Sequence, residues 1–354
     1  MNDSVSKILQ ERPLVSSAPC RIDAGGTWDI PAMALPLAGA VPTTVNLAIS
    51  PGTVVRLEAF DPGWVSISSE GFVRIETHPG HELPFHGPYG LFFAAVSHFG
   101  FHGLRIAIRA GLPVRSGLGG SSTALVALLH ALSRLRAILG GKPLRREGLL
   151  RLGFLLEDAV SNGHCGMQDQ AAAVYGGVNQ WVWRFGGGLC PFSRKPLLDA
   201  RGRAALSARI LVAHSGKSHV SSRTNRKWIG GFQDGTTRRG WLRANEITHS
   251  LARALEKRDW EGAAGFLREE MAVRRKITPE ALIPLTHRLI DRAERLGCGA
   301  RFAGAGAGGA VWALGEKGKI RRLRQAWEEL LRPHRGAGIL DCRVHGRGVH
   351  APRG

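Results

Sequence analysis

The sequence has few cysteines, and none of them lie close together. There is no Cys-x-x-Cys pair and no His/Cys spacing of the kind that binds structural zinc. This argues against a disulfide framework and against a zinc site. We therefore expect free thiols in a reducing, cytoplasmic compartment. The five positions are Cys20, Cys165, Cys190, Cys298 and Cys342.

Long apolar runs are also missing. No stretch reaches the ~18–20 apolar residues that cross a bilayer. The N-terminal segment MNDSVSKILQERPLVSS lacks the apolar core of an export signal. The sequence therefore predicts neither a membrane-spanning segment nor a membrane partner.

Acidic residues are scarce relative to basic ones. The chain has 48 Lys and Arg against 28 Asp and Glu, a formal net charge of +20. Such a charge is compatible with nucleic acid, an acidic surface or an anionic small molecule. The basic residues are dispersed, however, and no RNA-binding module or zinc-finger spacing accompanies them. We therefore interpret the charge as an arginine-rich surface and do not expect nucleic acid to be the main ligand.

With 354 residues, of which 44% are hydrophobic, the chain is long enough for two domains. Alternating apolar residues predict strands within 53–77, at 104–110 and at 208–216. Helical periodicity is present in both halves, so the fold is α+β or α/β with a cleft between the halves. Helices are predicted at 89–99, 147–161, 240–257, 259–275 and 280–296. The predicted domains are a poorly patterned lead-in at 1–17, a first domain at 18–200 and a second at 201–354.

Three glycines and two serines precede a long apolar helix in the stretch PVRSGLGGSSTA, residues 113–124. Glycine tolerates positive φ and has no Cβ to block a ligand. Ser121 and Ser122 stand where the N-cap of the helix is expected. The unpaired amides of a helix N-terminus suit a phosphate, and serine hydroxyls can ligate hydrated Mg²⁺. The alternative is a tight turn with no ligand. The glycines are Gly117, Gly119 and Gly120.

This stretch is neither a GxxxxGK[ST] loop nor a convincing GxGxxG. It closely resembles the phosphate-binding motif of the GHMP kinases, Pro-x-x-x-Gly-Leu-Gly-Ser-Ser-Ser/Ala. Gly120 departs from the usual serine or threonine, and Thr123 occupies a position where alanine is common. The resemblance implies ATP as the ligand and Ser121 as the serine that faces Mg²⁺. The matching residues are Pro113, Gly117, Leu118, Gly119, Ser121 and Ser122.

Two further segments support the resemblance. Residues 18–49 look like the N-terminal substrate motif in the form found in fucokinases and heptose-phosphate kinases. The stretch GARFAGAGAGGAVWAL, 299–314, resembles the third motif, a glycine turn beside the nucleotide loop. From this turn, Gly304 and Gly306 are expected at the ATP phosphates.

The segment GHCGMQDQ resembles the Gly-x-x-Asp-Gln of sugar kinases in this family, whose aspartate activates the attacking hydroxyl. The matching residues are Gly166, Asp169 and Gln170. Twelve positions before Asp169, Glu157 matches the glutamate that ligates Mg²⁺. Asp158 is adjacent, but neighbours on a helix point roughly 100° apart, so only one should face the site. We choose Glu157.

Arg21 matches an arginine near the transferred phosphate, and Asp29 matches an aspartate that hydrogen-bonds sugar hydroxyls. The spacing between them is one residue shorter than the motif expects, and the segment has GGTWD where those families have GGWSD or GGGTD. The loop could therefore be re-aimed, and Asp23 could share the role of Asp29. Gln170 and His219 are further substrate candidates. Two questions stay open. Lys217 or Arg223 either meets a substrate phosphate or belongs to an exposed basic loop. Trp28 either stacks on a sugar or packs beneath its own loop.

The resemblance implies a two-domain α+β fold, with a mixed α/β nucleotide-binding domain, a ferredoxin-like C-terminal domain and the active site between them. It also implies an ATP- and Mg²⁺-dependent kinase that transfers the γ-phosphate to a sugar or sugar-phosphate hydroxyl, at the anomeric position. The alternatives are a kinase for a non-sugar alcohol such as mevalonate or homoserine, and a sensor of the same fold that binds ligands without turnover.

Overall fold

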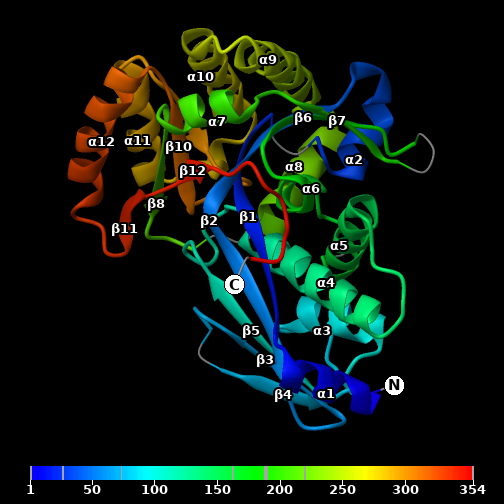
Figure 1. Cartoon of the computed structure of the whole chain (residues 1–354). Helices are drawn as coiled ribbons and strands as arrows, with labels where there is room; N and C mark the ends of the chain where they lie inside the picture. Colours follow the sequence, from blue (N-terminus) through cyan, green and yellow to red (C-terminus); the bar gives the residue numbers. More distant parts are fainter. Residues whose placement is uncertain are drawn as a thin grey trace.

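The computed structural model describes residues 2–25, 28–72, 74–161, 163–186, 190–218 and 221–352. Two sheets organise the chain, one in each half, and helices pack on both (Figure 1). None of the described helices is both long enough and apolar enough to span a bilayer. All five cysteines are free, as predicted.

The first sheet is built around one long strand, β2 (Thr43–Ala59). Strand β1 (Leu14–Ala24) runs antiparallel beside it, and the order of the others is β4-β3-β5-β2-β6-β7. Only the β3–β5 pair is parallel. A short last strand, β12, also pairs with β2. The bounds are β3 (Trp64–Ser69), β4 (Glu76–Pro79), β5 (Leu104–Ala110), β6 (Val178–Trp183), β7 (Phe192–Pro196) and β12 (Arg343–Val344).

One face of this sheet is covered by helices, of which α4 (Gly120–Ile138) is central (Figure 1). The leucines of its apolar face are all fully buried: Leu125, Leu128, Leu129, Leu132 and Leu135. This burial explains why the helix lies across β1 and β2, since an apolar stripe is stable only against another element. Around it pack α3 (Gly90–Phe99), α5 (Arg146–Val160) and α6 (Gln168–Tyr175).

The N-terminal residues differ from the prediction. Instead of a poorly patterned lead-in over 1–17, they form helix α1 (Asn2–Glu11) and the start of β1. Val5 and Leu9 are buried in the core, and the Ser6 hydroxyl donates to the Gly103 carbonyl at 3.0 Å. Val5 and Leu9 have the i, i+4 spacing of an amphipathic helix. One such pair is too short a pattern to predict a helix from a single sequence.

The second sheet is antiparallel throughout, with the order β11-β8-β10-β9. Along the chain its strands and helices alternate as β-α-β-β-α-β, which is the ferredoxin-like arrangement that the sequence analysis expected. The strands are β8 (Ile210–Ser215), β9 (Gly299–Phe302), β10 (Ala310–Leu314) and β11 (Ala337–Leu340). The helices are α7 (Ala200–Ser207), α8 (Ser221–Gln233), α9 (Arg238–Glu256), α10 (Trp260–Ile277), α11 (Pro284–Arg295) and α12 (Lys317–Leu331). A short helix, α2 (Pro31–Ala34), follows β1.

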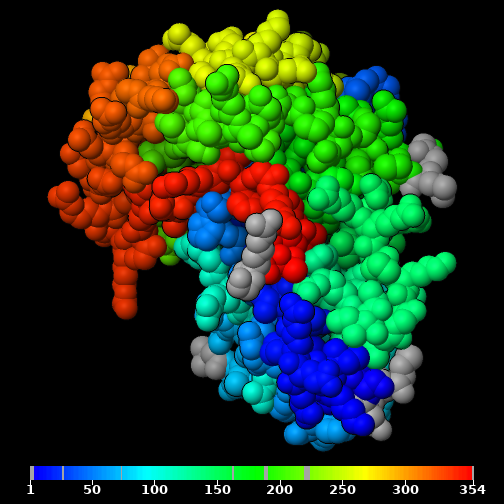
Figure 2. All heavy atoms as spheres, viewed as in Figure 1, coloured from blue at the N-terminus to red at the C-terminus, as the bar shows by residue number. Residues whose placement is uncertain are grey.

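The C-terminal segment returns to the first sheet. After β12, the Val349 amide donates to the Ala173 carbonyl at 2.8 Å, and His350 forms a bridge with Ser17. In Figure 2 this red segment crosses the middle of the molecule, between the two halves. The boundary between 18–200 and 201–354 stays a prediction, and the last residues pack against the first half.

The two glycine-rich turns lie against each other. The Ala310 amide donates to the Ser116 carbonyl at 2.7 Å. Gly309 has φ +64°, and a Cβ placed on it would lie 2.4 Å from the Ser116 carbonyl oxygen. A Cβ on Gly304 would likewise lie 2.9 Å from the carbonyl oxygen of Gly117. Glycine is therefore required in the third motif so that its backbone can support the loop before α4.

Gly309→Ala should lower the stability of the protein by about 2 kcal/mol, because alanine at this φ is strained and its Cβ meets backbone. Gly318→Ala is the matched control, since Gly318 lies in exposed α12 with nothing within 4 Å of an added Cβ. This control should be neutral or slightly stabilised. Urea unfolding measures both, and equal midpoints for the two variants would contradict the packing described.

Candidate active site

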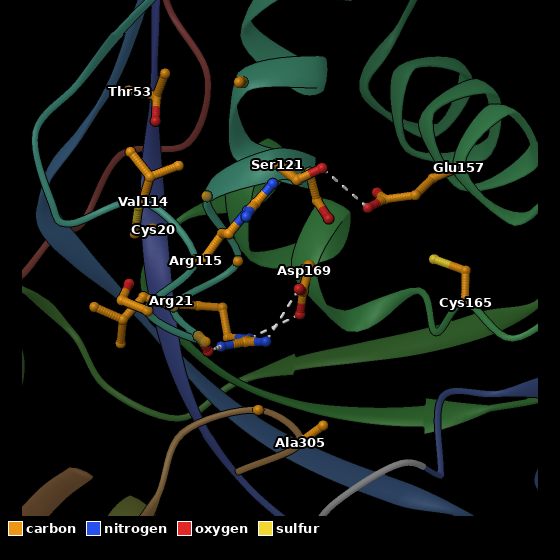
Figure 3. Close-up of a pocket in the computed structure, with 18 of the residues that line it drawn as sticks. Cys20, Arg21, Thr53, Val114, Arg115, Ser121, Glu157, Cys165, Asp169 and Ala305 are labelled. Atoms are coloured by element: carbon orange, nitrogen blue, oxygen red, sulfur yellow. Dashed lines mark hydrogen bonds and ion pairs between the residues drawn. The ribbon is translucent and has the colours of Figure 1, made fainter. Parts of the chain in front are cut away.

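A cavity of about 410 Å³ opens between the two halves (Figure 3). Its wall combines β1, the loop before α4, the end of α5 and the loop before α6 with Asn225 of α8 and the turn after β9. The predicted phosphate-loop residues lie together on this wall: Pro113, Gly117, Leu118, Gly119, Gly120, Ser121 and Ser122.

The N-terminus of α4 differs in one detail from the prediction. Its N-cap is Gly119, with φ +76°, so Ser121 and Ser122 lie inside the first turn instead of capping it. The Thr123 amide donates to the Gly119 carbonyl at 2.9 Å. The amides before Thr123 have no acceptor within the helix, and they lie at the cavity wall where an anion would be favoured.

Gly119 also brings this turn close to the helix α6. A Cβ on Gly119 would lie 3.2 Å from Asp169 Oδ2 and 3.5 Å from Arg21 Cγ. Together with the left-handed φ, this close approach explains why glycine stands here. The amide-rich end of α4 and the Asp169 carboxylate therefore face the same part of the cavity.

Arg21 and Asp169 form a bidentate ion pair, which Figure 3 shows with dashed lines. Arg21 Nε donates to Asp169 Oδ1 at 2.7 Å, and Nη2 donates to Oδ2 at 3.0 Å. Arg21 Nη1 donates to the Gly117 carbonyl, so the guanidinium also holds the phosphate loop. This geometry fixes the orientation of the carboxylate.

The Asp169 carboxyl keeps a face open to ligands. Its side chain is 23% exposed, against 6% for Arg21. Burial raises the pKa of Asp169 above its ordinary value, and the neighbouring guanidinium opposes that shift by favouring the carboxylate. A carboxylate with a raised pKa is a better proton acceptor than an ordinary one.

Glu157 projects from α5 toward Ser121 (Figure 3). The Ser121 hydroxyl donates to Glu157 Oε1 at 3.4 Å, and burial raises the pKa of this glutamate to about 7. Among the described residues, no group of three or more His, Cys, Asp or Glu is placed to hold a metal by itself. Two protein oxygens fit Mg²⁺, which takes hard oxygen ligands and keeps several positions for water and phosphate.

Asp158 has a different task. Its Oδ1 accepts a hydrogen bond from the Cys165 amide at 3.2 Å, so the side chain supports the loop before α6. It does not line the cavity. This geometry favours Glu157 over Asp158 as the metal ligand, although that role stays a prediction.

Gln170, predicted to touch substrate, lies behind the cavity. It is fully buried and absent from the lining. Its Nε2 donates to Glu157 Oε2 at 2.6 Å. The residue therefore positions Glu157 from outside the cavity lining, and its contact with substrate stays a prediction.

Asp23 is also withdrawn from the cavity. It is fully buried, and its carboxylate accepts from Arg301 Nη1 at 3.0 Å and from the Gly304 amide at 2.7 Å. Arg21 Nη1 lies 3.7 Å away. Asp23 therefore connects β1 to the third glycine turn and is not part of the cavity lining, so a share in the role of Asp29 stays a prediction.

Asp29 lines the cavity, at 2% exposure, and its contact with substrate stays a prediction. The Gln168 amide donates to its Oδ2 at 3.0 Å, and Gln168 Nε2 lies 3.4 Å from Oδ1. Burial raises the pKa of Asp29 to about 7, with a contribution from the nearby Asp169 charge. A Cβ on Gly166 would lie 1.9 Å from Asp29 Oδ2, which explains the glycine at that position.

Three other predictions have mixed outcomes. Gly304 lines the cavity, whereas Gly306 packs against the Ala281 carbonyl, where a Cβ would lie 2.6 Å away. The contact of Gly306 with the ATP phosphates stays a prediction. Trp28 is fully buried edge-on to Phe232, which is the packing alternative. His219 lies outside the described residues.

The sequence analysis missed several lining residues. Gln168 adjoins Asp169 in the motif, so proximity was the available signal. For Asn225 and His164 the sequence contained no such signal, because the two residues are 61 positions apart. They meet only in the fold, where Asn225 Nδ2 donates to the His164 carbonyl at 3.1 Å. The far end of the cavity is apolar and contains Phe72, Phe92 and Ile108.

Comparison with known proteins supports the resemblance. The family model described as "GHMP kinases N terminal domain" matches residues 89–177, and "GHMP kinases C terminal" matches 251–332. A mevalonate kinase from Pyrococcus horikoshii is 26% identical over 207 residues, which cover 56% of this chain. The match spans only 60% of that protein's length.

Solved structures share the fold over nearly the whole chain. Lactococcus lactis galactokinase, complexed with galactose, superposes with a TM-score of 0.77 at 15% identity, covering 99% of this chain and 98% of the other. A D-glycero-D-manno-heptose 1-phosphate kinase from Bacteroides thetaiotaomicron superposes with a TM-score of 0.72 at 19% identity, covering 96% of this chain and 99% of the other. At these identities the likeness shows the two-domain α+β fold alone. Because both domain models match in order on that fold, the chain belongs to the GHMP kinase family.

Proposed function

We propose that the protein is an ATP-dependent kinase that transfers the γ-phosphate to a hydroxyl of a sugar. The observation that carries this proposal is the position of Asp169. Its oriented carboxylate faces the same cavity as the unpaired amides of α4 and the Ser121–Glu157 pair. Phosphoryl transfer requires these parts together: a base beside the nucleophile and electrostatic support for the phosphates.

The reaction follows from this arrangement. The acceptor hydroxyl oxygen forms a bond to the γ-phosphorus, the bond to the β–γ bridging oxygen breaks, and ADP leaves with that electron pair. The hydroxyl proton passes to Asp169. Arg21 keeps the carboxylate aimed and lies beside the loop that holds the phosphates. The α4 amides stabilise the negative charge on the phosphate oxygens.

Mg²⁺ would be held by Ser121 and Glu157, with Gln170 fixing the glutamate from behind. When bound, the ion neutralises charge on the β- and γ-phosphates. The apolar end of the cavity, at Phe72, Phe92 and Ile108, suits a nucleobase. The sugar as acceptor and its anomeric hydroxyl rest on the resemblance of the Arg21–Asp29 and Gly166–Gln170 segments, and a cytoplasmic location rests on the free cysteines.

A second candidate is a kinase for a non-sugar alcohol, which the similarity to a mevalonate kinase favours. The segments carrying Asp29 and Asp169 argue for the sugar. A sensor without turnover is less well supported, because Ser121, Glu157 and Asp169 are all present and brought to one cavity.

Asp169→Asn should lower the rate of ATP-dependent phosphorylation by at least about 100-fold, since the amide accepts no proton and leaves Arg21 without its ion pair. The measurement is ADP release over a panel of sugars and alcohols, with nucleotide binding followed separately. Full activity in this variant would exclude Asp169 as the base.

Glu157→Gln should reduce turnover by roughly 100-fold, with partial recovery at high Mg²⁺ and nearly unchanged thermal stability. Asp158→Asn is the matched control and should do much less, because the Asp158 side chain does not line the cavity and an asparagine keeps the oxygen that accepts from the Cys165 amide. If Asp158→Asn abolished activity while Glu157→Gln did not, the metal ligand would be Asp158.

The contribution of Asp29 to the stability of the protein should fall as pH rises from about 4 to about 7. Asp29 has a folded pKa of about 7 against an ordinary value of 3.8, so in this window the unfolded chain loses its proton while the folded protein keeps it. Asp29→Asn should therefore weaken the pH dependence of urea unfolding, and Asp158→Asn serves as a carboxylate-to-amide control. An unchanged dependence in Asp29→Asn would show that Asp29 ionises normally.

A further inference from the structure

The part of the cavity beyond Asp169, away from the phosphate loop, is where an acceptor would lie. We call it the acceptor end. It is lined by Asp29, Gln168, His164, Cys165 and Asn225, with Asp169 at its border. The wall comes from both halves of the chain, because Asn225 belongs to α8 of the second half.

Acidic side chains dominate this end among the described residues. Asp29 and Asp169 both line it, and Asp29 has no ion-pair partner. Two arginines line the cavity as a whole. Arg21 is already paired with Asp169 and lies near Asp23, and Arg115 belongs to the phosphate loop. No other described Lys or Arg lines the cavity to meet an anionic group on the acceptor.

The polar atoms at this end need hydrogen-bond donors. Gln168 turns its amide nitrogen to Asp29, which leaves Oε1 buried without a partner. Asn225 turns its amide nitrogen to the His164 carbonyl, which leaves the Asn225 Oδ1 atom also buried without a hydrogen-bond partner. Reversing either amide would place oxygen against oxygen, so these orientations are determined by their neighbours. Unpaired buried acceptors are costly, and donors from a ligand would relieve that cost.

We infer that the acceptor is an uncharged polyol, a free sugar and not a sugar phosphate or a carboxylate, with Asp29, Gln168 and Asn225 determining this specificity. The inference rests on the proposed kinase function. Hydroxyl groups can donate to Asp29 and, if the two amides turn toward the cavity when the acceptor binds, to Gln168 Oε1 and Asn225 Oδ1, which are enclosed in the structure without ligand. An anionic group would instead stand beside two carboxylates in a water-poor site.

Lys217 is the described cation that a substrate phosphate could recruit from the second half. It is exposed and does not line the cavity. Its backbone carbonyl accepts from the Gly309 amide at 2.9 Å, which fixes its main chain beside the third glycine turn. Lys217 is therefore a suitable control position: it should have no part in binding an uncharged acceptor.

The test compares acceptors that differ in charge. ADP release is measured with galactose, mannose, fucose and free heptoses, and with galactose 6-phosphate, mannose 6-phosphate, heptose 7-phosphate and mevalonate. At least one uncharged sugar should have a kcat/KM ten or more times that of every charged acceptor. Preference for a phosphorylated or carboxylate acceptor would overturn the inference while leaving the kinase intact. No turnover with any acceptor of either kind would instead count against the proposed function.

Variants test the residues. With the preferred sugar, Asn225→Leu and Gln168→Leu should each raise KM about tenfold or more with a smaller effect on kcat, and Asn225→Asp should retain more affinity than Asn225→Leu because it keeps an acceptor. Lys217→Ala should leave kcat/KM within about twofold. An unchanged KM in both leucine variants, or a large loss in Lys217→Ala, would overturn the assignment. Thermal unfolding shows whether each variant remains folded.

Discussion

Arg21 reaches from β1 to α6 and holds the Asp169 carboxylate with two of its nitrogens, at 2.7 and 3.0 Å. Its third nitrogen holds the phosphate loop through the Gly117 carbonyl. Asp23, two residues along the same strand, lies beside Arg21 and binds both Arg301 and the Gly304 amide. One strand thus connects the base, the phosphate loop and the third glycine turn. The relative position of the two halves at the site depends on this set of buried charges.

Three carboxylates share the cavity wall, and each carries a raised pKa because it is withdrawn from water. The negative charge of Asp169 adds to the shift of both Asp29 and Glu157. Such an arrangement is unfavourable for an empty protein and favourable for one that binds a cation and hydroxyl donors. In the proposed enzyme, Mg²⁺ compensates Glu157, Arg21 compensates Asp169, and the acceptor supplies donors to Asp29. The proposed ligands therefore supply the positive charge and the hydrogen-bond donors that the buried carboxyl groups require.

The sequence predicted the parts of the site that are local in the chain. The glycine loop, Glu157 and the Gly166–Asp169 segment could be recognised because each is a short motif next to a periodic helix. The sequence did not show that Asp23 and Gln170 lie outside the cavity lining, because the partners that hold them, Gly304 and Glu157, lie 281 and 13 residues away. Spacing alone cannot show which face of a motif is already occupied. For the same reason Asn225 was not found, since it reaches the cavity only through the packing of α8.

Local turn chemistry accounts for the smaller differences. Ser121 and Ser122 have the composition of caps, but Gly119 takes the cap position because its left-handed backbone starts the helix two residues earlier. Gly306 belongs to the third motif, yet it packs on Ala281 because the turn leaves the cavity wall after Ala305. In both cases the difference from the prediction concerns the place that one residue takes within a recognised motif.

The central claim is that ATP phosphates lie at the N-terminus of α4 with the metal between Ser121 and Glu157 and the acceptor hydroxyl at Asp169. A crystal structure of the chain with Mg²⁺, a non-hydrolysable ATP analogue and a sugar tests this most directly. The account predicts β- and γ-phosphate oxygens on the amides of residues 119–122, with a sugar hydroxyl within hydrogen-bond distance of Asp169. Phosphates bound elsewhere, or a metal without Glu157 among its ligands, would contradict it.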